Sequence, residues 1–199
     1  MTDEKYQELI QPYSDASRMF LSRLDVLKHS LYDESFGKPI HTIQNRIKSK
    51  ESIENKLKKK EKEATCMNAK DYLQDIAGIR VICYFVEDIY NLADTLKRQA
   101  DLILIRESDY ILNPKENGYR SYHLIFGVPV YYVDAMEYFP VEVQFRTIAM
   151  DFWASMEHRI LYKSSREDRE EVAAELQEYA LNLAEMEKNF ERYSVGKMC

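Results

Sequence analysis

Residues 141–147, Val-Glu-Val-Gln-Phe-Arg-Thr, alternate between apolar and polar side chains. Because successive side chains of a strand point to opposite faces, the segment is predicted to be a strand with one face in a core. The other face carries Glu142, Gln144 and Arg146, an acid, an amide and a guanidinium able to hold a metal ion, a polar base and a phosphate. Taken alone, the segment also fits an ordinary half-exposed strand with a cross-strand ion pair.

The composition is that of a soluble globular protein. The chain has 199 residues, 45% of them hydrophobic and 31% charged, so one domain with a sizeable core is expected. No apolar run reaches the roughly 20 residues needed to cross a bilayer, and the N-terminus lacks the features of a signal peptide, which predicts a cytoplasmic protein without membrane contact. Three widely spaced cysteines indicate neither a disulfide framework nor a zinc site.

Charge is unevenly distributed along the chain. The net charge of −6 argues against a protein that coats nucleic acid. Seven bases but only two acids nevertheless fall in residues 46–60. This segment either binds the phosphates of a small polyanion or forms a lysine-rich solvated helix. The donors expected to converge there, two on a strand and three on one side of the helix that follows, are Arg46, Lys48, Ser52, Lys56 and Lys59.

Apolar residues recur at helical spacing near both ends of the chain. The stripe from Leu9 to Leu31 predicts a long amphipathic helix, interrupted in its first turns by Pro12. The stripe from Val172 to Tyr193 keeps a strict four-three alternation, typical of a helix that packs along another helix. These two helices are expected to pair with each other or with a second subunit. The regular seam favours a homo-oligomer, with a tetramer among the options.

Shorter elements are predicted between the terminal helices. A hairpin around 134–137 is expected to join the last two strands. Thr147 is expected to cap the helix that follows the last strand and runs through Trp153 to Lys163. The pattern predicts an α+β fold in which helices flank a mixed central β-sheet. The predicted strands are 42–48, 79–85, 102–105, 123–130 and 141–147, and the other helices are 51–63 and 87–100.

The segment DIAGIRV, residues 75–81, carries polar groups that a buried strand does not need. Asp75 precedes the strand, Gly78 permits close backbone approach, and Arg80 has the opposite parity to the apolar residues around it. Asp75 is either a functional carboxylate or a turn residue, and Arg80 is either a binding group or a surface arginine.

The segment NPKENGYRSYH, residues 113–123, is predicted to be a loop that enters a strand near His123. Tyr119 suits stacking on a base, while Lys115 and Arg120 suit phosphate. An exposed loop tyrosine is more often ordinary surface, so this segment gains weight only in combination with the others.

Asp75 and Glu142 are expected to meet at the ends of neighbouring strands. Two carboxylates about 4 Å apart repel by several kcal/mol at an effective dielectric near 20, so such a pair needs a shared proton or a cation. Beside a lysine-rich phosphate site the natural cation is Mg²⁺, which bridges carboxylates to substrate phosphates. The residues therefore predict a transferase of nucleotide phosphates.

DIAGIRV, NGYRSYH and EVQFRTIAMDFWASMEH, with RIKSKESIENKLKKK upstream, resemble the small alarmone synthetases, the single-domain branch of the RelA/SpoT family. The resemblance implies a nucleotidyltransferase-like fold in one synthetase domain, 1–199, with a helical region over 1–36, a catalytic core over 40–163 and a C-terminal helix over 166–195. It also implies transfer of the β,γ-diphosphate of ATP to the 3′-hydroxyl of GDP or GTP, with Mg²⁺ as cofactor.

Position by position, the resemblance implies the following roles. Asp75 and Glu142 would hold Mg²⁺, and Glu142 would also assist deprotonation of the 3′-hydroxyl. Arg46 and Arg80 would sandwich the adenine. The ATP phosphates would be bound by Lys48, Ser52, Lys56 and Lys59. The acceptor nucleotide would be bound by Tyr119, stacked on guanine, and by Lys115, His123, Gln144 and Asp151.

The chain is expected to synthesise the alarmone without degrading it. The sequence has no His-Asp dipeptide and, at 199 residues, no room for the hydrolase and regulatory domains of long family members, so synthesis without degradation is expected. Asp151 stands where some relatives have Asn. Toxin-like members that pyrophosphorylate the 3′ end of tRNA would need a broad basic surface, which a net acidic chain does not offer. A non-catalytic nucleotide- or RNA-sensing protein would not need both Asp75 and Glu142.

Overall fold

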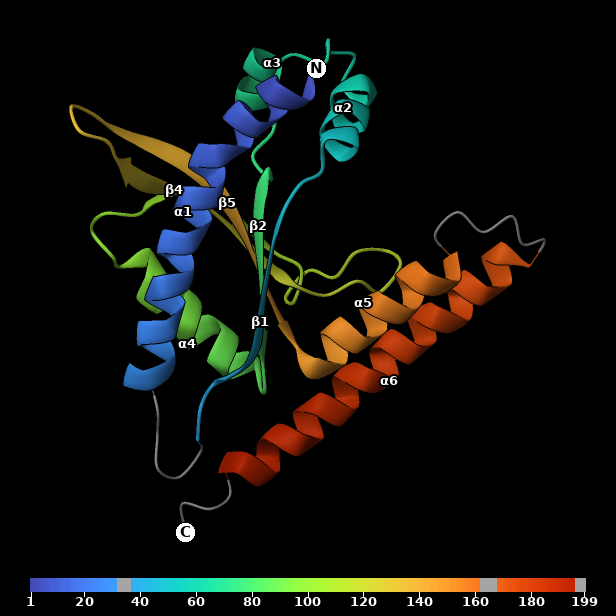
Figure 1. Ribbon diagram of the computed structural model, residues 1–199. Helices are drawn as coiled ribbons and strands as arrows, with labels where there is room; N and C mark the ends of the chain where they lie inside the picture. The colour runs from blue at the N-terminus through green and yellow to red at the C-terminus, as the bar shows by residue number, and fades with distance from the viewer. Residues whose placement is uncertain (32–36, 162–167, 196–199) are drawn as a thin grey trace.

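The computed structural model describes residues 1–31, 37–161 and 168–195. Its helices and strands form the predicted α+β arrangement (Figure 1). The sequence pattern missed the short helix α3 and placed several strand ends too far inward. In chain order the elements are α1 (Asp3–Ser30), β1 (Ile40–Ile47), α2 (Lys50–Lys59), α3 (Cys66–Tyr72), β2 (Ala77–Cys83), α4 (Val86–Lys97), β3 (Ile103–Asp109), β4 (Tyr122–Tyr131), β5 (Met136–Thr147), α5 (Ile148–Leu161) and α6 (Arg169–Val195).

The five strands form one mixed sheet in the order β1-β2-β5-β4-β3. β2 and β5 are parallel, and the other neighbours are antiparallel. In the parallel pair Gly78 lies opposite Glu142, and Arg80 lies opposite Gln144. Because paired residues point to the same face, the polar positions of the two central strands share one side of the sheet.

The apolar face of the sheet is covered by α1 and α4. The Phe20 ring of α1 lies 5.6 Å from the Phe126 ring of β4, and the Tyr90 ring of α4 lies 5.4 Å from the Tyr122 ring of the same strand. Phe126 and Tyr122 have the same parity, so both helices pack on one face. The buried apolar residues of α1 belong to the predicted stripe: Leu9, Tyr13, Ala16, Phe20, Leu24 and Leu27.

The prediction that Pro12 interrupts the first helix was wrong, because α1 continues through Pro12 without a break. Proline in a helix removes the hydrogen bond to the carbonyl four residues earlier, here Glu8. Glu8 is exposed, so water can satisfy that carbonyl. Burial of the stripe that follows Pro12 stabilises the continuous helix.

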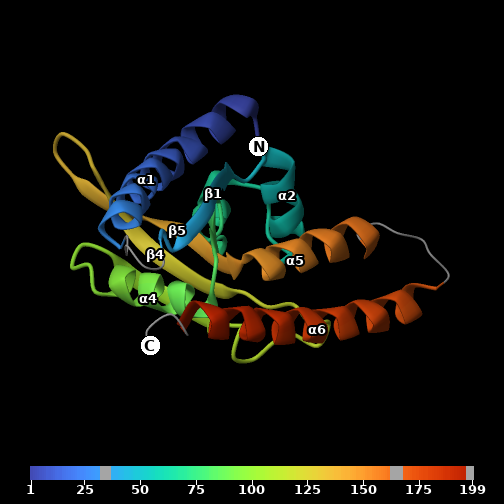
Figure 2. The same ribbon diagram turned by 90° about the horizontal axis from the view of Figure 1, so that it is seen from below.

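On the other side, α5 packs against β2 and β5, and α6 lies along α5 (Figures 1 and 2). Thr147 caps α5 as predicted, since its Oγ1 accepts a hydrogen bond of 3.2 Å from the Met150 amide. The predicted end of this helix, Lys163, lies outside the described residues. In the described part of the chain no helix is long and apolar enough to span a membrane.

The C-terminal stripe packs only in part. Leu176 is buried against α5, whereas Tyr179, Met186, Phe190 and Tyr193 are 52%, 52%, 59% and 77% exposed. α1 lies on the sheet and α6 lies along α5, so the option in which the two terminal helices pair with each other is not adopted.

Candidate active site

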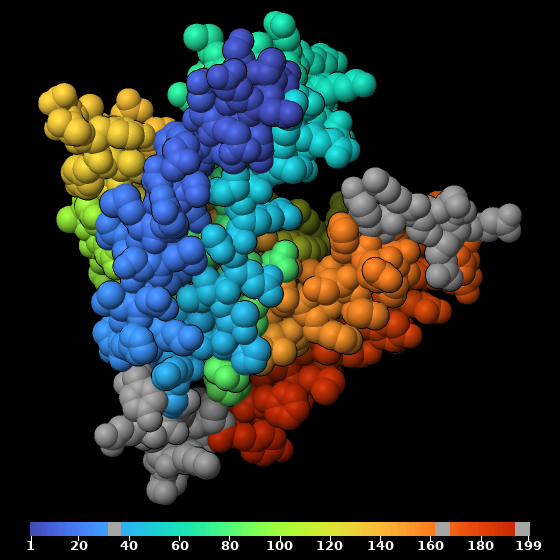
Figure 3. Space-filling model, in the orientation of Figure 1, coloured from blue at the N-terminus to red at the C-terminus, as the bar shows by residue number. Residues whose placement is uncertain are grey.

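The polar face of β1, β2 and β5 opens into a cavity of about 210 Å³. In the space-filling view the molecule is hollowed between α2 and α5 (Figure 3). This face brings together both predicted acids and both predicted adenine-binding arginines. The lining residues are Gln44, Asn45, Arg46, Asp75, Gly78, Ile79, Arg80, Glu142 and Gln144.

Asp75 lies between two lysines at the edge of this cavity. Its Oδ2 accepts hydrogen bonds from Lys48 Nζ and, at 2.7 Å, from Lys56 Nζ. Burial favours a raised pKa for Asp75, but the two ammonium groups outweigh burial and hold the pKa below its ordinary value. Asp75 is therefore ionised at neutral pH, and its Oδ1 is buried without a hydrogen-bond partner.

Glu142 is held by neighbours on β5 and β4. Gln144 Nε2 donates a 2.9 Å hydrogen bond to Glu142 Oε2, and His123 Nδ1 lies 3.6 Å from Oε1. Burial favours a raised pKa for Glu142, as does the nearby Asp75, but His123 and Gln144 together keep the pKa below its ordinary value. Glu142 is thus an ionised and oriented carboxylate.

The donor set fits a divalent cation that takes oxygen ligands. Asp75 and Glu142 repel each other, and the orphaned Oδ1 of Asp75 gives a cation an oxygen that no protein group uses. The described residues contain no cluster of three or more acidic, histidine or cysteine side chains that could hold a metal alone. Substrate phosphates would have to complete the coordination, as Mg²⁺ sites in nucleotide enzymes commonly require.

A chain of charges joins the two predicted substrate sites. Asp151, in the first turn of α5, forms ion pairs with Arg80 at 3.2 Å and with Arg146 at 2.9 Å. Burial and then the charge of Arg146 lower the pKa of Arg80, while Asp151 acts in the opposite direction. Arg146, which the sequence left as a phosphate contact or a structural ion pair, is 6% exposed and forms the ion pair.

The predicted acceptor residues gather around Tyr119. Its hydroxyl is 3.0 Å from His123 Nε2 and accepts a 2.8 Å hydrogen bond from Arg146 Nη2. Lys115 Nζ lies 5.0 Å from the centre of the Tyr119 ring. Tyr110, which the sequence did not single out, lies 5.3 Å from the His123 ring and 6.2 Å from the Tyr119 ring.

Two of the residues predicted to bind the ATP phosphates lie outside the cavity lining. Ser52 and Lys59 are exposed on α2 and do not line the cavity, although Ser52 faces Ser49 across a 2.8 Å hydrogen bond. Sequence reasoning also missed Gln44 and Asn45 in the lining. They had no distinguishing signal, because their role depends on how β1 pairs with β2.

Comparison with known proteins agrees with this geometry. Residues 45–167 match the family described as "Region found in RelA / SpoT proteins". The chain is 49% identical to the GTP pyrophosphokinase YwaC of Bacillus subtilis over 71% of this chain and 68% of that protein. It is 35% identical to the GTP pyrophosphokinase YjbM of the same organism, over 89% of this chain and 82% of that protein.

A solved structure is similar over almost the whole chain. The small alarmone synthetase 1 of Bacillus subtilis, bound to its product pppGpp, has a TM-score of 0.87 and 31% identity, covering 99% of this chain and 100% of that one. Motifs, site geometry, sequence relatives and fold thus agree, and the chain belongs to the RelA/SpoT family, in the branch of the small alarmone synthetases.

Proposed function

We propose that this chain transfers the β,γ-diphosphate of ATP to the 3′-hydroxyl of GDP or GTP, producing ppGpp or pppGpp and AMP. The observation that carries the proposal is that Asp75 and Glu142 line one cavity with Arg46 and Arg80, while His123 connects Glu142 with Tyr119. Relatives named GTP pyrophosphokinases support the same reaction.

In this proposal the donor nucleotide binds over β1 and β2. Arg46 and Arg80, which line the same cavity, hold the adenine between them. Lys48 and Lys56 turn from Asp75 to the phosphates, which carry more negative charge than one carboxylate. Ser52 and Lys59, exposed on α2, meet the outer part of the phosphate chain.

The acceptor nucleotide binds against the loop before β4 and the C-terminal end of β5. Tyr119 stacks on guanine, and Lys115 and Arg146 lie 5.0 and 5.2 Å from the centre of its ring. Gln144 and Asp151 contact the same nucleotide. His123 is tied to both Tyr119 and Glu142, so it links the acceptor base to the reacting end.

The reaction is an in-line displacement at the β-phosphorus of ATP. Glu142, ionised at neutral pH, accepts the proton of the 3′-hydroxyl while the 3′-oxygen of the acceptor bonds to the β-phosphorus. The bond between that phosphorus and the bridging α,β-oxygen breaks, and AMP leaves with the electron pair. Asp75 and Glu142 would hold Mg²⁺, which when bound neutralises charge on the phosphates. Lys48 and Lys56 stabilise the charge that develops there.

One assay tests the proposal against its alternatives. The purified protein is incubated with γ-labelled ATP, Mg²⁺ and, in turn, GDP, GTP, ATP or tRNA, and the products are separated. Label in a guanosine nucleotide supports the proposal. Label in tRNA alone would contradict it in favour of the toxin-like alternative, and label in no acceptor would favour a non-catalytic sensing protein.

Assembly, location and extent belong to the same proposal. The exposed apolar residues of α6 suit contact with a second copy of the chain in a homo-oligomer. The cytoplasmic location stays a prediction, as does the division into one synthetase domain with a catalytic core over 40–163.

A further inference from the structure

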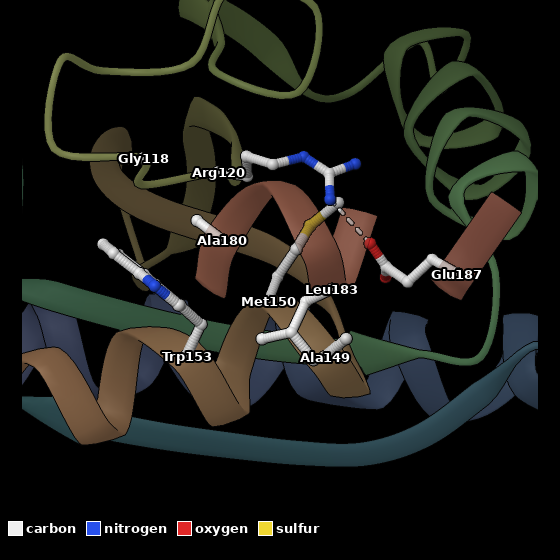
Figure 4. A pocket seen from close by; sticks show the side chains of 8 residues that line it. All are labelled: Gly118, Arg120, Ala149, Met150, Trp153, Ala180, Leu183 and Glu187. Atoms are coloured by element: carbon white, nitrogen blue, oxygen red, sulfur yellow. Dashed lines mark hydrogen bonds and ion pairs between the residues drawn. The ribbon is translucent and has the colours of Figure 1, made fainter. Parts of the chain in front are cut away.

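The end of the loop that carries Tyr119, residues 118–120, packs against α6, whereas residues 112–117 are exposed. Gly118 has a φ of 89°, and a Cβ at this position would lie 2.7 Å from the Ala180 Cβ of α6. The space enclosed between the loop, α5 and α6 is about 10 Å³, which holds at most one water molecule (Figure 4). Such close contact at Gly118 means that α6 fixes the position of this end of the loop.

A single carboxylate joins three parts of the fold at this contact. Glu187 of α6 accepts a 2.6 Å hydrogen bond from Arg120 Nη1 through Oε2 and a hydrogen bond from the Thr147 hydroxyl through Oε1. Figure 4 shows the Arg120 and Glu187 side chains pointing toward each other. Arg120 belongs to the loop before β4, and Thr147 ends β5 and caps α5.

The ion pair is largely shielded from water. The side chains of Arg120 and Glu187 are 16% and 13% exposed, and Thr147 is buried. Removing Glu187 would leave a mostly buried guanidinium without its partner, which favours a move of the loop toward solvent.

Displacement of Arg120 would reach the acceptor site directly. Arg120 follows Tyr119 in the chain, and the Tyr119 hydroxyl must stay within 2.8 Å of Arg146 and 3.0 Å of His123. The donor side depends on other elements, namely β1, α2 and β2. Loss of Glu187 should therefore affect one nucleotide and spare the other.

We infer that Glu187 is a positioning residue for the acceptor nucleotide, holding the Tyr119 loop against α6 and the end of β5. The inference rests on the proposed function, because it takes Tyr119 to stack on the acceptor base. No described residue of α6 lines the cavity, yet under this inference the helix sets the affinity for the acceptor nucleotide.

Kinetics of Glu187→Gln test this inference, with Glu185→Gln as the matched control. Glutamine keeps the size of the side chain but removes its charge, and Glu185 is an exposed acid on the same helix. For Glu187→Gln the KM for GDP should rise about tenfold, the factor expected when one charge-assisted hydrogen bond is lost. The KM for ATP, the kcat at saturation and all constants of the control should change less than twofold. Equal increases in both KM values, a fall in kcat alone, or no change would each overturn the inference.

Hydrogen exchange tests the same point without catalysis, so failure of the proposed reaction and failure of this inference remain distinguishable. The Lys115 and Gly118 amides donate to the carbonyls of Tyr119 and Lys115 within the loop. In Glu187→Gln a peptide over 113–121 should exchange about tenfold faster, as a loop less firmly held opens more often, whereas one over 40–47 should be unchanged. Unchanged exchange in the loop, or faster exchange throughout the protein, would refute a positioning role.

Discussion

Replacing Arg146 by methionine removes the guanidinium that joins Asp151 to Tyr119 and keeps a long apolar stem in a buried position. Arg146 is 6% exposed, so its hydrogen bonds are made away from bulk water. The bond to the Tyr119 hydroxyl involves a charged donor, which contributes about 1.5–3 kcal/mol, and the guanidinium 5.2 Å from the ring centre adds about 0.5 kcal/mol or more.

Part of the arrangement survives this substitution. Tyr119 keeps its hydrogen bond with His123, and Asp151 keeps its ion pair with Arg80. We therefore expect GDP binding to weaken by about 2 kcal/mol, which raises its Kd about thirtyfold. Binding of a non-hydrolysable ATP analogue should change much less, because Arg80 remains paired.

Isothermal titration calorimetry with GDP and with the ATP analogue measures both effects. Arg106→Met, which removes an exposed arginine from β3, is the control for the change in net charge. A double-mutant cycle with Tyr119→Phe isolates the hydrogen bond. GDP binding within threefold of the wild type, or equal weakening of both nucleotides, would refute the role given to Arg146.

Three further predictions concern Asp75, Gly118 and Asp151. The folded-state pKa of Asp75 is lowered, so its contribution to stability is complete above the ordinary carboxyl pKa near 4 and is lost as pH falls through the folded-state pKa. Urea unfolding should therefore show Asp75→Asn about 2 kcal/mol less stable than wild type at pH 7, with the difference shrinking toward pH 3. Gly118→Ala should lower the melting temperature and raise the KM for GDP, because its Cβ meets Ala180, and Ala180→Gly in the same chain should restore part of both. Asp151→Asn should raise the KM of ATP and of GDP at least about fivefold in initial-rate assays, since it leaves two mutually repelling arginines without their shared carboxylate; an effect on one nucleotide alone would contradict this bridging role.

Local patterns predicted the polar face well. Alternation along 141–147 placed Glu142, Gln144 and Arg146 on one side of β5, because side-chain parity is fixed within a strand. The same logic placed Arg80 away from the apolar positions of β2. That these two strands are parallel neighbours follows from the whole sheet and could not be deduced from either segment.

The partners of the charged residues were beyond local pattern. Lys48 and Lys56 both bind Asp75, which lies 27 residues after Lys48 and 19 residues after Lys56. They meet there because α2 is docked beside the start of β2. Arg120 pairs with Glu187 across 67 residues. Sequence spacing indicated which lysines share a helix side, but it contained nothing about the carboxylate that would oppose them. Pro12 shows the converse, since a strong local signal was overridden by burial of the stripe around it.

On the polar face of β5, Glu142 takes part in the transfer step itself, while other residues bind the nucleotides. Glu142→Gln keeps the side-chain shape but removes the proton acceptor, and Glu137→Gln changes an exposed acid of the same strand as control. Transfer from γ-labelled ATP to GDP, measured beside the Kd of GDP and of an ATP analogue on the same preparations, is the decisive measurement. Glu142→Gln should bind both nucleotides within about fivefold of wild type and lose transfer by roughly a thousandfold or more, since it lacks the general base. Transfer at the rate of the Glu137→Gln control would contradict the role of Glu142 as general base.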